Sequence, residues 1–216
     1  MRSHALLLIG IILTGCGTFP VLIGEPPRPA AQPVHPADDR AVPLAPDEQG
    51  RSIAQAALAL AEAEHRGRVI RLGNRRYPLD CSGTILAIHY AAGIDLLPAF
   101  SAETGNGVAR LWKMGTETSP RKGDVVFWDN TYDRNRNGLW DDKLTHAGVI
   151  VDIDANGTIS YVHHHYRLGI IVEQMNLERP EDRNLNSAMR MRGQTDPEGR
   201  GRWLASHLYR GARALH

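Results

Sequence analysis

One cysteine and several histidines stand at positions that suit nucleophilic catalysis by a thiol. Cys81 lies in the run Asp80-Cys81-Ser82-Gly83, directly before an apolar stretch, and His146 opens a later run rich in β-branched residues. A thiol attacks as the thiolate, a form that a helix N-terminus or a neighbouring imidazole favours. Because free cysteines are also among the most buried residue types, this position alone leaves a purely structural role open for Cys81.

The pattern around Cys81 predicts that it opens a helix. Apolar residues recur with helical spacing over residues 85–92, and Gly93 stands where such a helix would end. An earlier helical stripe starts at Ser52. We therefore expect the folded domain to begin with helices.

Strand patterns follow these helices. Residues 125–128 are β-branched or aromatic, and the strand patterns 146–152 and 158–163 flank the turn residues 154–157, as in a β-hairpin. Helices followed by antiparallel strands predict an α+β fold in which N-terminal helices pack on an antiparallel sheet. The stretch 203–215 has the spacing of a short amphipathic helix that covers this sheet.

The first residues differ in character from the rest of the chain. Arg2 precedes an apolar run, residues 5–13, which is shorter than the ~20 residues of a membrane-spanning helix and is typical of a secretion signal. Leu13-Thr14-Gly15-Cys16 resembles the lipobox of bacterial lipoproteins, and an ordinary signal peptide with an incidental Cys16 is the alternative. The resemblance implies acylation of Cys16 and, with Gly17 after it, a place at the outer membrane of the cell envelope, facing the periplasm.

Residues 17–50 contain eight of the thirteen prolines, which is typical of an extended tether. We therefore expect a signal peptide at 1–16, a tether at 17–50 and a folded domain at 51–216. The chain has two cysteines, so acylation of Cys16 would leave Cys81 without a disulfide partner. A lone exported thiol is then expected to be either buried or used in chemistry.

Four stretches resemble, in order and at plausible separation, those of the NlpC-type family of cell-wall cysteine peptidases: residues 80–83, 97–98, 123–127 and 146–150. The match spans most of residues 53–165. It implies a papain-like fold with Cys81 at the start of the central helix as the nucleophile and His146 as the base. In the mechanism that this resemblance implies, His146 would hold the Cys81 thiolate as an ion pair.

A histidine at the end of the next strand often orients the base in this family, and His163 matches that place. Since His163 and His165 would face the same side of a strand, His165 is the competing residue, and His164 is expected on the other side. The alternative for the whole run is adventitious metal binding or a solvated edge. Tyr77 and Ser82 are candidates for an auxiliary role at the oxyanion. In the family, the tyrosine stands in a motif with paired glycines, and this sequence lacks that motif.

The segment before His146 resembles the calcium loop of EF-hands. Side-chain oxygens recur at positions 1, 3, 5 and 9, a glycine stands at position 6, and a backbone carbonyl would come from position 7. Leu144 stands at position 12 in place of the glutamate, so the bidentate ligand is missing or replaced by Asp142, and a plain Asx-rich turn is the alternative. The candidate ligands of a structural Ca²⁺ are Asp133, Asn135, Asn137, Leu139, Asp141 and Asp142.

These features together predict a lipid-anchored cysteine hydrolase that cleaves amide bonds in peptidoglycan stem peptides. We expect it to need no cofactor for this chemistry and to act as a monomer. The formal net charge of +1 gives no indication of a nucleic-acid partner. Two alternatives stay open: a non-catalytic module that binds the wall, and an acyltransferase or lipid deacylase that uses the same thiolate.

Overall fold

The computed structural model describes residues 45–65, 67–190 and 201–215. The expected signal peptide, the acylation site at Cys16 and nearly all of the expected tether lie outside these residues. Within the part that is described, no helix has both the length and the apolar character needed to cross a bilayer.

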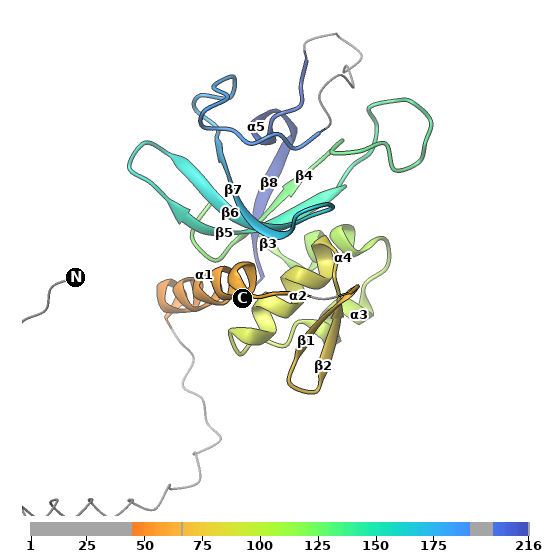
Figure 1. Cartoon of the computed structure of the whole chain (residues 1–216), viewed down its shortest axis with the longest axis vertical. Helices are drawn as coiled ribbons and strands as arrows, with labels where there is room; N and C mark the ends of the chain where they lie inside the picture. Colours follow the sequence, from red (N-terminus) through yellow and green to blue (C-terminus); the bar gives the residue numbers. More distant parts are fainter. Residues whose placement is uncertain (1–44, 66, 191–200, 216) are drawn as a thin grey trace, which may run out of the picture. The chain divides into compact units, whose positions relative to one another are not determined.

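A six-stranded antiparallel sheet lies at the centre of the fold (Figure 1). Its strands, in spatial order, are β3 (Thr116–Thr118), β8 (Tyr209–Ala214), β4 (Val125–Trp128), β5 (His146–Ile153), β6 (Thr158–His165) and β7 (Gly169–Asn176). Strands β4 to β7 are neighbours in chain order, whereas β8 inserts between β3 and β4. The predicted α+β fold is confirmed, and β4, β5 and β6 lie close to the ranges that the sequence indicated.

Helices lie on both sides of this sheet (Figure 1). On one side are α1 (Pro46–Glu62), α2 (Cys81–Ala91), α3 (Leu97–Ala102) and α4 (Gly107–Met114), and on the other is α5 (Ala205–Leu208). A small hairpin of β1 (Val69–Leu72) and β2 (Arg75–Pro78) also packs against α2. Helix α2 therefore contacts the hairpin as well as strands β5 and β6.

Strand alternation divides the apolar side chains into two cores. In β5, Ala147, Val149 and Val151 belong to the core on the side of α1 and α2, together with Ile85 of α2. Ile150 belongs to the second core, which includes residues of α5. Because both faces of β5 are buried, its pairing register is strongly specified.

The first helix begins earlier than the sequence pattern indicated. Helix α1 starts at Pro46 rather than near Ser52, so residues 46–50, which the sequence places in the tether, are part of this helix. Proline suits the first helical position because its missing N–H would have no partner there. Asp47 and Glu48 in the first turn also suit the positive end of the helix dipole.

The prediction of a helix over residues 203–215 is wrong for most of this stretch. Helix α5 covers only Ala205–Leu208, and the chain then continues directly into β8. Strand β8 pairs with β3 on one side and with β4 on the other. These long-range pairings override the helical spacing of the local sequence.

Two glycines of the motifs allow close approaches that position the site. An added Cβ at Gly83 would lie 2.0 Å from the carbonyl oxygen of Pro78, so α2 can meet the end of β2 only with glycine here. An added Cβ at Gly148 would lie 2.9 Å from the carbonyl oxygen of Val162 and 3.1 Å from Cβ of His163. Gly83 and Gly148 thus leave room for the backbone next to Cys81 and for the side chain of His163.

Candidate active site

Cys81 is the first residue of α2, and Asp80 caps this helix. The Asp80 carboxylate accepts hydrogen bonds from the backbone N–H of Gly83 at 2.8 Å and from the hydroxyl of Ser82 at 2.9 Å. Such a cap satisfies a free N–H group of the first turn and stabilises the helix start. Ser82, one of the auxiliary candidates, therefore serves the cap.

The Cys81 thiol lies beside the start of β5. Although Cys81 keeps some exposure as a residue, burial of the thiol raises its pKa to about 12, and the Asp80 carboxylate acts in the same direction. The backbone N–H groups of Ser82, Cys81 and Ala147 act against this rise, because they donate toward the sulfur. Since Ala147 directly follows His146, this contact brings the thiol to the strand that carries the candidate base.

His146 and His163 form the central contact of the site. Nε2 of His146 lies 2.8 Å from Nδ1 of His163, across the neighbouring strands β5 and β6. The ring of Trp128 packs against the His146 ring with centroids 5.8 Å apart. Because Nε2 of His146 is engaged by His163, Nδ1 is the ring nitrogen that this contact leaves free.

His163, and not His165, reaches His146. Nδ1 of His165 instead accepts hydrogen bonds from two backbone N–H groups of the turn between β6 and β7, at 3.2 and 3.1 Å. His164 lies close enough to Asp80 for the two to interact electrostatically. Burial lowers the pKa of His164, and the negative charge of the Asp80 carboxylate partly offsets this effect. The structure thus separates three adjacent histidines into one that contacts His146, one that closes a turn and one near the helix cap.

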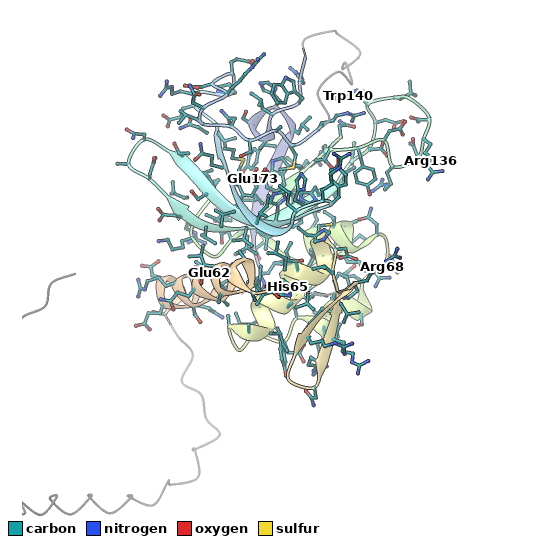
Figure 2. The ribbon with its side chains drawn as sticks, in the orientation of Figure 1. Glu62, His65, Arg68, Arg136, Trp140 and Glu173 are labelled. Atoms are coloured by element: carbon teal, nitrogen blue, oxygen red, sulfur yellow. The ribbon has the colours of Figure 1, made fainter. Side chains whose placement is uncertain are left out.

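Glu173 on β7 adds a polar group that the motifs did not indicate (Figure 2). Its Oε2 lies 3.1 Å from Nε2 of His163. The contact is short but not well aligned, and neither atom has another hydrogen-bond partner among the described residues. The sequence did hold a signal, since Glu173 is a charged residue in an apolar strand, two positions beyond Ile171, which pairs with His163.

The pKa shifts of Cys81 and His146 act against the expected ion pair. Burial lowers the pKa of His146 well below its ordinary value, and the neighbouring histidines 163 to 165 act in the same direction. The pKa of the Cys81 thiol is raised. The two shifts together favour a neutral thiol and a neutral imidazole at rest, rather than thiolate and imidazolium.

Tyr77 lies away from the thiol. Its ring packs against that of Tyr90 with centroids 5.9 Å apart, and the residue is 2% exposed. Tyr90 is in the last turn of α2, whereas Cys81 opens the helix about 14 Å away along its axis. Tyr77 is therefore a core residue of the small hairpin rather than a group at the thiol.

The loop between β4 and β5 gathers several of the predicted calcium ligands; Figure 2 shows it, with Trp140 labelled, projecting from the sheet. Asp133 accepts hydrogen bonds from two backbone N–H groups of the loop at 3.2 and 2.9 Å. The amides of Asn135 and Asn137 donate to the Asp141 carboxylate at 3.1 to 3.3 Å. Among the described residues, no group of three or more histidine, cysteine, aspartate or glutamate side chains could hold a metal, so this donor set depends on its asparagines.

Asp142 does not join this cluster. It is 1% exposed, its Oδ2 accepts a hydrogen bond from the N–H of Arg134 at 3.0 Å, and its Oδ1 lies 3.8 Å from the Arg134 guanidinium. Asp142 therefore contacts Arg134 within the loop and does not replace the missing glutamate as a calcium ligand. The N–H of Leu139 donates to Asn137 at 2.8 Å, and calcium binding by the remaining ligands stays a prediction.

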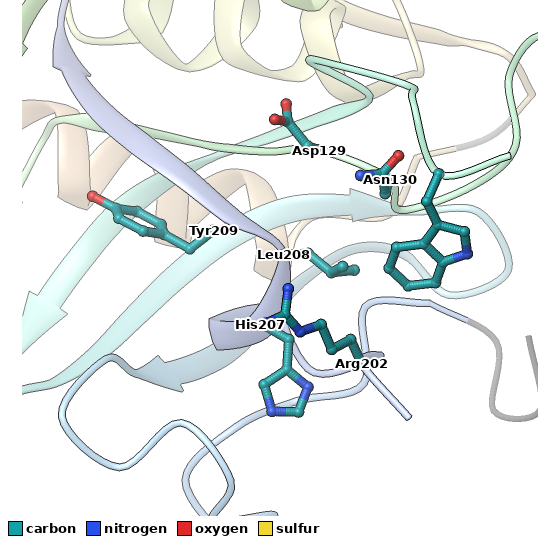
Figure 3. Close-up of a pocket in the computed structure, with 7 residues that line it drawn as sticks. Asp129, Asn130, Arg202, His207, Leu208 and Tyr209 are labelled. Atoms are coloured by element: carbon teal, nitrogen blue, oxygen red, sulfur yellow. The ribbon is translucent and has the colours of Figure 1, made fainter. Parts of the chain in front are cut away.

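A pocket beside α5 does not include the candidate catalytic groups (Figure 3). Two of its charged or titratable side chains pair with neighbours, Asp129 with Arg210 at 3.1 Å and His207 with Glu181 at 3.2 Å. We assign no chemistry to this pocket. Its lining residues are Asp129, Asn130, Trp140, Arg202, His207, Leu208 and Tyr209.

The lowered pKa of His146 predicts a pH-dependent stability. Below the ordinary value of 6.5, the unfolded chain binds a proton at this residue that the folded chain does not, so stability is lost as the pH falls. The loss is about 1.4 kcal/mol per pH unit until the folded-state pKa is reached. Urea unfolding of the wild type and of His146→Gln between about pH 7 and pH 5 should therefore give a smaller pH dependence for the variant. Equal slopes would show that His146 is not held neutral by the fold.

The calcium interpretation predicts that Ca²⁺ raises the melting temperature. An ion between Asp133 and Asp141 would bind only the folded loop, and at about 100 times its Kd it would add about 2.7 kcal/mol. Thermal melts in Ca²⁺ and in chelator test this, with Asp141→Asn expected to abolish the shift. Asp152→Asn, on β5 and outside the loop, is the control that should retain it. No change of the wild-type melting temperature in either condition would refute calcium binding.

Comparison with known proteins identifies no relative whose residue roles could be assigned to this chain. No protein-family model, no curated protein and no solved structure matches the chain. The functional interpretation therefore depends on the sequence motifs and on the geometry around Cys81, His146 and His163.

Proposed function

We propose that this chain is a cysteine hydrolase, of the NlpC type and with a papain-like fold, that cleaves amide bonds in peptidoglycan stem peptides. The observation that carries the proposal is the 2.8 Å contact of His146 with His163, together with the backbone N–H of the next residue, Ala147, which donates toward the Cys81 sulfur. Thiol hydrolases need a cysteine, an adjacent imidazole and a further group that orients the imidazole. Cys81, His146 and His163 supply these parts.

His146 acts as the general base and then as the general acid. Its Nδ1 takes the proton of the Cys81 thiol while the sulfur bonds to the amide carbonyl carbon and the carbonyl π electrons move onto oxygen. When the carbonyl re-forms, the C–N bond breaks and the imidazolium gives its proton to the leaving amine. Water then attacks the thioester and transfers a proton to His146, and the C–S bond breaks as the sulfur regains that proton.

Because the Cys81 thiol and the His146 imidazole are both neutral at rest, the proton moves to His146 as the sulfur attacks the carbonyl carbon, in one concerted step. With the pKa of the thiol raised and that of His146 lowered, a separated ion pair is unfavourable until the substrate carbonyl accepts the developing charge. The backbone N–H groups of Ser82, Cys81 and Ala147 donate toward the sulfur and are our candidates for stabilising this charge. Backbone donors of this kind stabilise an oxyanion, a role for which Tyr77 is not placed.

The substrate class follows from the family resemblance and from the expected acylation of Cys16. Acylation would anchor the chain at the outer membrane, facing the periplasm, and the proline-rich tether would carry the domain toward the cell wall. Peptidoglycan is the amide-rich polymer in that compartment. A thiol site anchored in this compartment would therefore have stem peptides within reach as substrates.

Digestion of purified sacculi tests the proposed function. The wild type should release new muropeptides, identified by liquid chromatography and mass spectrometry, and Cys81→Ala should lower the rate by about 10³-fold or more. His146→Ala should fail in the same way, because it removes the base. His65 lies three residues beyond the end of α1 and hydrogen-bonds to the Leu60 carbonyl, so His65→Ala is the matched control and should keep the wild-type rate.

Other outcomes would favour the alternatives. Identical products from the wild type and Cys81→Ala would refute the peptidase. Binding to sacculi without new products would support the non-catalytic wall module. Release of fatty acid from lipid substrates, or transfer of an acyl group to an added amine, would support the deacylase or the acyltransferase.

A further inference from the structure

Glu173 ends a row of three polar side chains that also includes His146 and His163. Two contacts join them, 2.8 Å between the histidines and 3.1 Å between Nε2 of His163 and Oε2 of Glu173. Glu173 pairs with Tyr161 in the β6–β7 register, so it lies on the same face of the sheet as His163. The side chains of His163 and Glu173 are 2% and 19% exposed, so water screens their contact only weakly.

The contact between the histidines is compatible with two arrangements of the protons. In the first, the N–H at Nε2 of His146 donates to Nδ1 of His163, and Nδ1 of His146 keeps a lone pair that can accept the thiol proton. In the second, Nδ1 of His163 is the donor, and the proton of neutral His146 sits on Nδ1. Only the first arrangement lets His146 act as a base toward Cys81.

The carboxylate distinguishes the two arrangements. In the first, neutral His163 carries its proton on Nε2, where it faces Glu173, and an ionised carboxylate can only accept. In the second, a lone pair on Nε2 would face the carboxylate oxygen at 3.1 Å, which is repulsive. The first arrangement is therefore favoured wherever Glu173 is ionised.

We propose that Glu173 is a positioning residue that holds His163 in its Nε2–H tautomer and thereby keeps Nδ1 of His146 free to accept the Cys81 proton. This role rests on the proposed function, since it concerns the base of that reaction. Glu173 acts through His163 and does not touch the reacting atoms.

Tyr161 is a second titratable group next to Glu173, with which it pairs across β6 and β7. Its ring lies against His163 with centroids 5.4 Å apart. Burial raises the pKa of Tyr161 well above its ordinary value, and the Glu173 carboxylate adds to this rise. Tyr161 therefore stays a neutral hydroxyl and leaves the charge of Glu173 directed at His163.

Nitrogen-15 NMR of the histidine rings tests this proposal directly. Long-range proton–nitrogen spectra of the full chain, assigned with His163→Gln, should show wild-type His163 with its proton on Nε2. In Glu173→Gln the side-chain amide can donate or accept, so His163 should become a mixture of both tautomers. Glu178→Gln, the same substitution just beyond the end of β7, should leave His163 unchanged.

Kinetics on muropeptides give the second readout. Glu173→Gln should lower kcat on the order of 10-fold to 100-fold with little change in KM, because the base and not the substrate contacts is affected. A wild-type His163 with its proton on Nδ1, or an unchanged tautomer in Glu173→Gln, would overturn the proposal. If the wild type proves inactive on muropeptides, the proposed function fails, while the tautomer measurement still decides what Glu173 does to His163.

Discussion

The contact between His146 and His163 crosses from β5 to β6 and therefore depends on the register of these two strands. Gly148 lies opposite His163 in that register, and its missing Cβ leaves room for the His163 side chain. A slip of one residue would turn His163 to the other face of the sheet and remove the contact. The apolar residues on both faces of β5 oppose such a slip, so the packing of the two cores sets the distance between the rings.

Burial has a second consequence for the chemistry. It raises the pKa of Cys81 and lowers that of His146, so the same environment that orders the site disfavours separated charges in it. Asp80 adds to this effect at the thiol while it caps α2, so helix stability and thiol acidity oppose each other at one carboxylate. In the proposed reaction, charge would therefore develop only with the substrate carbonyl in place, where backbone N–H groups can stabilise it.

Local patterns were sufficient for the features whose causes are local. The cap before Cys81 and the turn residues of the β5–β6 hairpin act within a few residues, so the helix start and the hairpin could be predicted. The choice between His163 and His165 could not, because both face one side of β6 and only the pairing with β5 separates them. Strand β8 joins the sheet by pairing with β3 and β4, which are distant from it in sequence. Glu173 reaches His163 through the pairing of β6 with β7. Tyr77 stands four positions before Cys81 in the chain, yet packs at the opposite end of α2.

The central claim is that Cys81 carries the acyl group during hydrolysis, with the histidine pair as its base. Mass spectrometry of the protein after acid quenching of a single turnover with a muropeptide tests this most directly. We predict that the acyl fragment of the substrate is found as a thioester on the peptide that contains Cys81, and that this adduct is absent in His146→Ala. An acyl fragment on another side chain, or turnover by Cys81→Ala at the wild-type rate, would contradict the account.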